Sequence, residues 1–150
     1  MAHRWAALSC LGLLAAAAHA QFAMVPRPVR PAAGALQASQ ALDERAYRVD
    51  AGRHIYAAYP SRVMQGMMPP LMHAVLVTET VVDAKGAVKS VRIVRAPASA
   101  KEVAPWVVQM IRRAAPLPPP ARMGGVRYVE IWLVDKSGRF QVHSLTEGQR

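Results

Sequence analysis

The chain has 150 residues, of which 53% are hydrophobic, and its formal net charge is +10 at pH 7. This length and apolar content predict one small domain with a core of its own and exclude a wholly disordered chain. The basic residues are scattered singly, Arg112-Arg113 being the only adjacent pair, and no aromatic residues are interleaved with them. A solvated basic surface is therefore expected, and nucleic acid is not expected as a partner.

The first twenty residues have the pattern of a secretory signal peptide. A short basic start precedes the alanine-rich apolar run Ala6–Ala18, and Ala18-His19-Ala20 fits an Ala-x-Ala cleavage site before Gln21. An uncleaved anchor in the inner membrane is the alternative, although such an anchor needs about 20 strongly apolar residues. The only cysteine, Cys10, lies in this run, so the expected mature chain has no disulfide and no thiolate metal site.

Residues 21–46 are rich in proline and alanine and are predicted to be a tether, followed by a domain over residues 47–150. Within this region Ala38–Arg48 is compatible with one or two turns of helix, because it contains good helix formers. Tyr59-Pro60 is predicted to be extended and to open the structured part of the domain.

Four methionines and a histidine are close together between Ser61 and His73: Met64, Met67, Met68, Met72 and His73. Thioether and imidazole ligands suit Cu(I), so a periplasmic copper-binding protein is one functional alternative. The simpler interpretation is that the methionines fill an irregular gap beneath a proline-bent loop, and on that interpretation no metal or other cofactor is expected.

The stretch from His73 to Arg95 predicts an antiparallel hairpin, since two β-branched runs flank the turn Asp83-Ala-Lys-Gly86. In the first strand the alternation places Val75, Val77, Glu79 and Val81 on one face and Leu76, Thr78, Thr80 and Val82 on the other. One face is expected to pack and the other to be partly solvated.

The period changes after Pro97 and predicts an amphipathic helix that starts near Ala104, with Pro105 in its first turn. Its apolar face is formed by Val103, Val107, Met110, Ile111 and Ala114. The proline cluster after Ala115 ends it. Trp106 is interpreted as a packing residue.

Residues 126–134 alternate as a strand, with Val129, Ile131 and Leu133 on one face and Tyr128, Glu130 and Trp132 on the other. A second turn, residues 135–138, leads to a shorter return strand over residues 139–145, with Phe140 and Val142 pointing inward. The fold class expected is α+β: a small antiparallel sheet with one packed helix, in the order ββαβ(β).

This order of elements resembles the C-terminal domain of TonB, a periplasmic energy transducer of Gram-negative bacteria. The residues that carry the resemblance are Tyr59-Pro60, the turn region 81–86 with Val88, Val91 and Val94, and the segment 111–120 leading to the strand 126–134. The resemblance implies recognition of an extended peptide, such as one from an outer-membrane transporter, by pairing with the strand after the helix. The implied partner-binding residues are Arg127, Tyr128, Val129, Glu130, Ile131, Trp132 and Leu133, with Trp132 as the anchor.

The function expected is therefore an exported periplasmic protein-binding module that recognises an envelope protein by strand addition. A membrane-anchored energy transducer of the TonB type is the main alternative, and a second copy of the chain, paired through a sheet edge, is the alternative partner. An enzyme is not expected, because the mature histidines His54, His73 and His143 are isolated and no catalytic constellation is evident.

Overall fold

The computed structural model describes residues 20–31 and 36–148. The predicted signal peptide, apart from Ala20, and the alternative membrane anchor lie outside these residues. Within the described ranges, no helix combines the length and the apolar character that crossing a bilayer requires.

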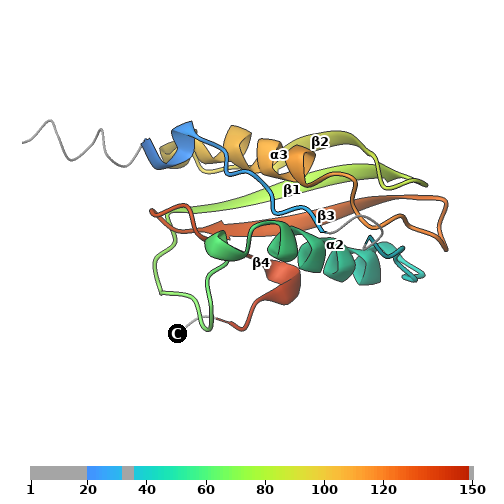
Figure 1. Cartoon of the computed structure of the whole chain (residues 1–150). Helices are drawn as coiled ribbons and strands as arrows, with labels where there is room; N and C mark the ends of the chain where they lie inside the picture. The colour runs from blue at the N-terminus through green and yellow to red at the C-terminus, as the bar shows by residue number, and fades with distance from the viewer. Residues whose placement is uncertain (1–19, 32–35, 149–150) are drawn as a thin grey trace, which may run out of the picture.

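Four antiparallel strands form one sheet in the order β2-β1-β3-β4, shown in Figure 1. The strands are β1 (Ala74–Asp83), β2 (Val88–Arg95), β3 (Gly125–Val134) and β4 (Phe140–Val142). Two long helices lie within the described residues, α2 (Glu44–Ala58) and α3 (Val103–Ala114), with three short 3-10 helices between and after them: η1 (Pro60–Arg62), η2 (Ala98–Ala100) and η3 (His143–Leu145). The predicted α+β class and the order ββαββ are confirmed, but two helices pack on the sheet where one was expected.

The hairpin between β1 and β2 forms where the sequence predicts it. The Asp83 carboxylate accepts hydrogen bonds from the backbone N–H groups of Lys85 and Ala87, both at 2.9 Å. Gly86 follows with a φ of 86°, a conformation that costs other residues free energy. Its position also leaves no room for a side chain, because a Cβ atom there would clash with the carbonyl oxygen of Leu117.

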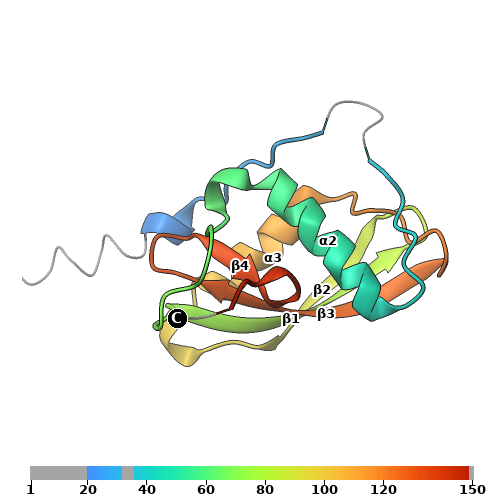
Figure 2. The same cartoon turned by 90° about the horizontal axis from the view of Figure 1, so that it is seen from below.

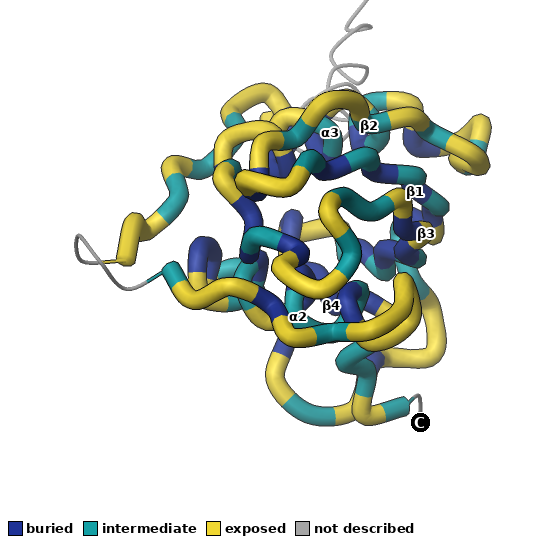
Figure 3. Tube along the Cα trace, turned by 90° about the vertical axis from the view of Figure 1, so that its right-hand side faces the viewer, coloured by how far each residue is buried: buried dark blue, intermediate teal, exposed yellow. Residues whose placement is uncertain are grey.

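Strands β1 and β3 each have one buried face and one more open face, as the alternation predicts. In β1, Leu76, Thr78, Thr80 and Val82 are buried, whereas Val75 is exposed and the residues alternating with it are partly buried. Both helices cover the buried face, called here the inner face, with α3 along β2 and α2 along β3 (Figure 2). Buried residues accordingly lie between the helices and the sheet (Figure 3).

Helix α3 begins one residue before the predicted start and has Pro105 in its first turn. All five residues of the predicted apolar face are buried, and so is Trp106, which confirms the helical period. The chain leaves the helix at Ala115 and continues into the proline cluster.

Helix α2 was placed wrongly from the sequence, which suggested only a short helix over Ala38–Arg48. The helix begins after Asp43, whose carboxylate accepts a hydrogen bond from Ala46 N at 2.8 Å and caps it. Its buried face consists of two large residues, Tyr47 and Ile55, and three small ones, Ala51, Gly52 and Ala58, so the apolar stripe is weaker than in most packed helices. Tyr59-Pro60 therefore follows a packed helix and does not open the structured part of the domain.

Part of the stretch predicted as a tether packs against the two helices. We call residues 22–31 the strap. Phe22 is buried and lies edge-on to Trp106, with ring centroids 5.3 Å apart. Val29 N donates to Ala58 O at 2.7 Å, and Val25 O accepts a hydrogen bond from Arg113 at 2.8 Å. The strap thus joins the end of α2 to α3.

Candidate protein-binding site

The strand predicted to bind a partner, β3, lies inside the sheet between β1 and β4. The predicted contact residues Tyr128, Glu130 and Trp132 are only 4%, 3% and 2% exposed, because they point to the inner face beneath the helices. Trp132 donates through Nε1 to Thr78 Oγ1 at 3.1 Å and is a core residue. The prediction that these side chains contact a partner is therefore wrong.

The other predicted residues of this strand, Arg127, Val129, Ile131 and Leu133, point to the outer face of the sheet and are exposed or partly buried. Arg127 approaches the Glu79 carboxylate at 3.6 Å from the neighbouring strand. These four side chains remain accessible, but strand addition depends on the backbone edge and not on a face.

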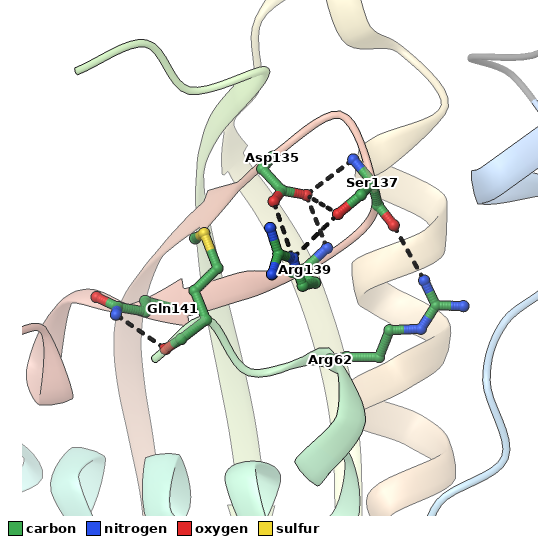
Figure 4. Close-up of polar contacts among 6 residues, drawn as sticks. Arg62, Asp135, Ser137, Arg139 and Gln141 are labelled. Carbon is green, nitrogen blue, oxygen red and sulfur yellow. Dashed lines mark hydrogen bonds and ion pairs between the residues drawn. The ribbon is translucent and has the colours of Figure 1, made fainter. Parts of the chain in front are cut away.

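Much of the β3 edge is already occupied. β4 pairs with residues Trp132–Val134, and a network of side chains holds β4 in place (Figure 4). Asp135 in the turn accepts hydrogen bonds from Ser137 and Arg139, while Gln141 donates to Met64 O at 3.0 Å. The predicted return strand is confirmed, with Phe140 and Val142 buried, but its last three residues form η3.

Beyond β4, side chains occupy further backbone groups on the same edge. Glu130 accepts from Ile131 N at 2.9 Å, and Arg48 from α2 donates to Val129 O at 3.4 Å. Glu130 also accepts hydrogen bonds from the hydroxyl and the backbone N–H of Ser144, which fixes η3 beside the strand. Burial raises the pKa of Glu130, and the hydrogen bonds from Ser144 and Ile131 oppose that rise only in part.

The open edge of the sheet is β2, at the opposite end from β4. The backbone carbonyl of Val129 and the backbone N–H of Ile131 are bonded to side chains and not to β1. Odd-numbered residues of β3 therefore direct their backbone groups away from β1. Backbone groups alternate in direction along a strand, so the odd-numbered residues of β1, Glu79 and Val81, bond to their β2 partners Arg92 and Ser90. The N–H and C=O groups of Val91 and Ile93 consequently point outward. No hydrogen bond to these outward groups occurs within the described residues.

The β2 strand carries positive charge and no negative charge. Lys89, Arg92 and Arg95 are exposed, and β2 contains no acidic residue. Arg92 is paired across the sheet with Glu79 at 3.2 Å, which leaves Lys89 and Arg95 without an ion pair among the described residues. Basic residues on an edge strand oppose pairing with another basic strand.

The methionine-rich stretch begins alongside β4, where Val63 forms a parallel bridge with Phe140. Met64 and Met68 are buried and Met67 is exposed, and Met64 N donates to Phe140 O at 3.0 Å. His73 is hydrogen-bonded through Nε2 to Glu102 at 3.0 Å and stacks on Phe22. Burial of two of the four methionines agrees with the gap-filling interpretation.

The three histidines among the described residues do not converge. His54 contacts the carbonyl of Ala114, His73 contacts Glu102, and His143 is exposed. Among the described residues no group of three or more His, Cys, Asp and Glu side chains is placed to hold a metal ion.

No family profile, curated protein sequence or solved structure matches this chain.

Proposed function

We propose that this chain is an exported protein-binding module of the Gram-negative envelope that pairs an extended, acidic segment of a partner with the β2 edge. One observation carries the proposal: β2 is a terminal strand of eight residues, and its outward backbone groups have no partner in the described chain. Export rests on the leader-like first twenty residues, and the mode of recognition on the resemblance of the element order to the TonB C-terminal domain.

The charge of the edge favours a partner over a second copy of the chain. Antiparallel pairing of two β2 strands would place Lys89, Arg92 and Arg95 of one copy close to the same residues of the other, and like charges across a ladder are destabilising. An acidic strand forms the same backbone hydrogen bonds and adds attraction. The site therefore combines main-chain affinity with selection by charge.

Panning a random peptide library on the purified chain tests this function. The expected result is enrichment of peptides with alternating β-branched and acidic residues. Binding of the best peptide should weaken at least tenfold in a Lys89→Glu/Arg95→Glu variant, because attraction becomes repulsion at two positions on the strand.

The matched control is Arg45→Glu/Lys136→Glu, which changes the net charge equally at exposed positions away from β2. If both double variants weakened binding equally, net charge alone would explain the loss, and this result would contradict edge recognition. Enrichment of basic or purely apolar peptides would contradict the proposed partner chemistry.

A further inference from the structure

Five arginines that are scattered in the sequence come together on a surface distinct from the β2 edge. They are contributed by the strap, by η1 and by the end of α3, and we call them the arginine face: Arg27, Arg30, Arg62, Arg112 and Arg113. They line two adjoining open hollows of about 760 Å³ and about 470 Å³, and Arg27 and Arg113 border both. The hollows are thus parts of one continuous surface.

The charge of this face is not neutralised by the described chain. No acidic residue lines either hollow, and no described carboxylate forms an ion pair with any of the five arginines. The carbonyl end of α3 lies beside Arg112 and Arg113, but a helix end is equivalent to about half a negative charge. Five guanidinium groups exceed it about tenfold, so helix capping explains little of the cluster.

Hydrogen bonds to backbone carbonyls hold two of the five arginines in place. Arg113 donates to Val25 O at 2.8 Å, and Arg62 donates to Ser137 O at 3.1 Å. Phe22 and Val29 fix the strap at its two ends, through the Trp106 contact and the hydrogen bond to Ala58. The backbone of the face and two of its guanidinium groups are consequently in place before any ligand arrives, which reduces the entropy lost on binding.

Exposed apolar side chains accompany the charge. Met24 and Val29 lie on the strap beside Arg27 and Arg30 and are 79% and 58% exposed. Apolar groups that project next to guanidinium groups suit the boundary of a bilayer, where phosphates and acyl chains meet. A soluble phosphorylated molecule would satisfy the arginines but would give Met24 no apolar environment.

The position of the strap in the sequence points in the same direction. Met24 comes six residues after Ala18, the end of the apolar run. The strap therefore comes directly after the predicted signal peptide, which would meet the membrane during export whether or not it is later removed.

We infer that the arginine face binds the surface of an anionic phospholipid bilayer, with the guanidinium groups on lipid phosphates and Met24 and Val29 at the acyl boundary. Arginine suits this role because its planar fork pairs with two phosphate oxygens at once. The protein would then be held on a membrane with its β2 edge, on another part of the surface, free for a partner.

Vesicle co-sedimentation tests the inference, with vesicles of phosphatidylcholine alone and with about 30% phosphatidylglycerol. Wild type and variants carry the same N-terminus, so any contribution of residues 1–19 is common to all. Binding should require phosphatidylglycerol and should fall roughly 100-fold in Arg27→Gln/Arg30→Gln/Arg112→Gln, since each basic residue near an anionic surface contributes about fivefold. The matched triple Arg45→Gln/Arg122→Gln/Lys136→Gln should retain binding to within about threefold.

A further variant separates a bilayer from a free phosphate as the ligand. Met24→Ser/Val29→Ser should weaken vesicle binding several-fold while leaving every charge in place. Unchanged binding of this variant, together with displacement by millimolar inorganic phosphate at constant ionic strength, would assign the face to soluble phosphate and overturn the inference. Equal loss in both triple variants, or no binding to the anionic vesicles, would also overturn it.

Discussion

Replacement of Glu130 tests whether a buried carboxylate holds the β3 edge closed. Glu130→Ala removes the acceptor of three hydrogen bonds, from Ile131 N, Ser144 N and the Ser144 hydroxyl. A buried donor left without an acceptor costs about 1–3 kcal/mol. Ser144 is partly exposed, so water can reach part of the site. We therefore expect the free energy of unfolding to fall by about 2–4 kcal/mol in urea denaturation followed by tryptophan fluorescence.

Glu130→Gln separates the hydrogen bonds from the charge. The amide keeps an acceptor oxygen for the two backbone donors and buries no charge, so its stability at pH 7 should lie within about 1 kcal/mol of wild type or above it. Burial raises the pKa of Glu130 above its ordinary value of 4.5. The stability contributed by the protonated form is fully present below that value and is lost as the pH rises through the folded pKa.

Wild type should therefore lose stability relative to Glu130→Gln as the pH rises from about 4 to 7. The reasoning would be refuted if the glutamine variant were as unstable as the alanine variant at pH 7, because attraction to Arg48 would then outweigh the cost of burying the charge.

Three further predictions concern the core and the hairpin. Gly86→Ala should lower the free energy of unfolding by about 3 kcal/mol or more, because a Cβ atom would clash with Leu117 O at a positive φ; a loss below about 1 kcal/mol in urea denaturation would contradict that geometry. Trp132→Phe should cost about 1–3 kcal/mol by thermal denaturation, since it removes the buried bond to Thr78 Oγ1, and an unchanged melting temperature would place Trp132 outside the core. Burial raises the pKa of all four tyrosines, that of Tyr59 to about 12: Tyr47, Tyr56, Tyr59 and Tyr128. Absorbance titration should therefore show no phenol ionising near pH 10 in the folded protein, and all four should ionise together when the chain unfolds at alkaline pH. The stability contributed by the neutral phenols is fully present below their unfolded pKa of about 10 and is lost as the pH rises through the raised folded pKa values. Gradual ionisation of the native protein near pH 10 would contradict the burial.

The sheet and α3 were predictable because their periods are strong. The alternation in β1 and β3 correctly divided the side chains of each strand between two opposite faces, and the spacing of Val103, Val107 and Met110 located the helix within one residue. The turn between β1 and β2 was also predictable from its residue types, since Asp83 accepts a hydrogen bond from the turn backbone and Gly86 takes a positive φ.

The elements that failed lack such local signals. Three of the five buried residues of α2 are alanine or glycine, which weakens its apolar stripe, and the strap is held by a few long-range contacts such as that between Phe22 and Trp106. Alternation also divides a strand into two faces without saying which face the helices cover. That ambiguity made the Trp132 side of β3 a candidate surface, although it is the core side.

The location of the open edge could not be read from the sequence either. Strand order depends on which strands pair, and the short β4 adds to β3 and leaves β2 terminal. The arginine face was missed for a similar reason, because its members come from three segments between Arg27 and Arg113.

Amide hydrogen exchange at β2, measured with and without the tightest acidic peptide from the library, tests the central proposal most directly. The outward N–H groups of Val91 and Ile93 should exchange fast in the free chain and slow at least tenfold in the complex, while those of Ser90 and Arg92, bonded to β1, change little. Protection that appeared on residues 127–131 of β3, with Val91 and Ile93 unchanged, would contradict recognition at the β2 edge.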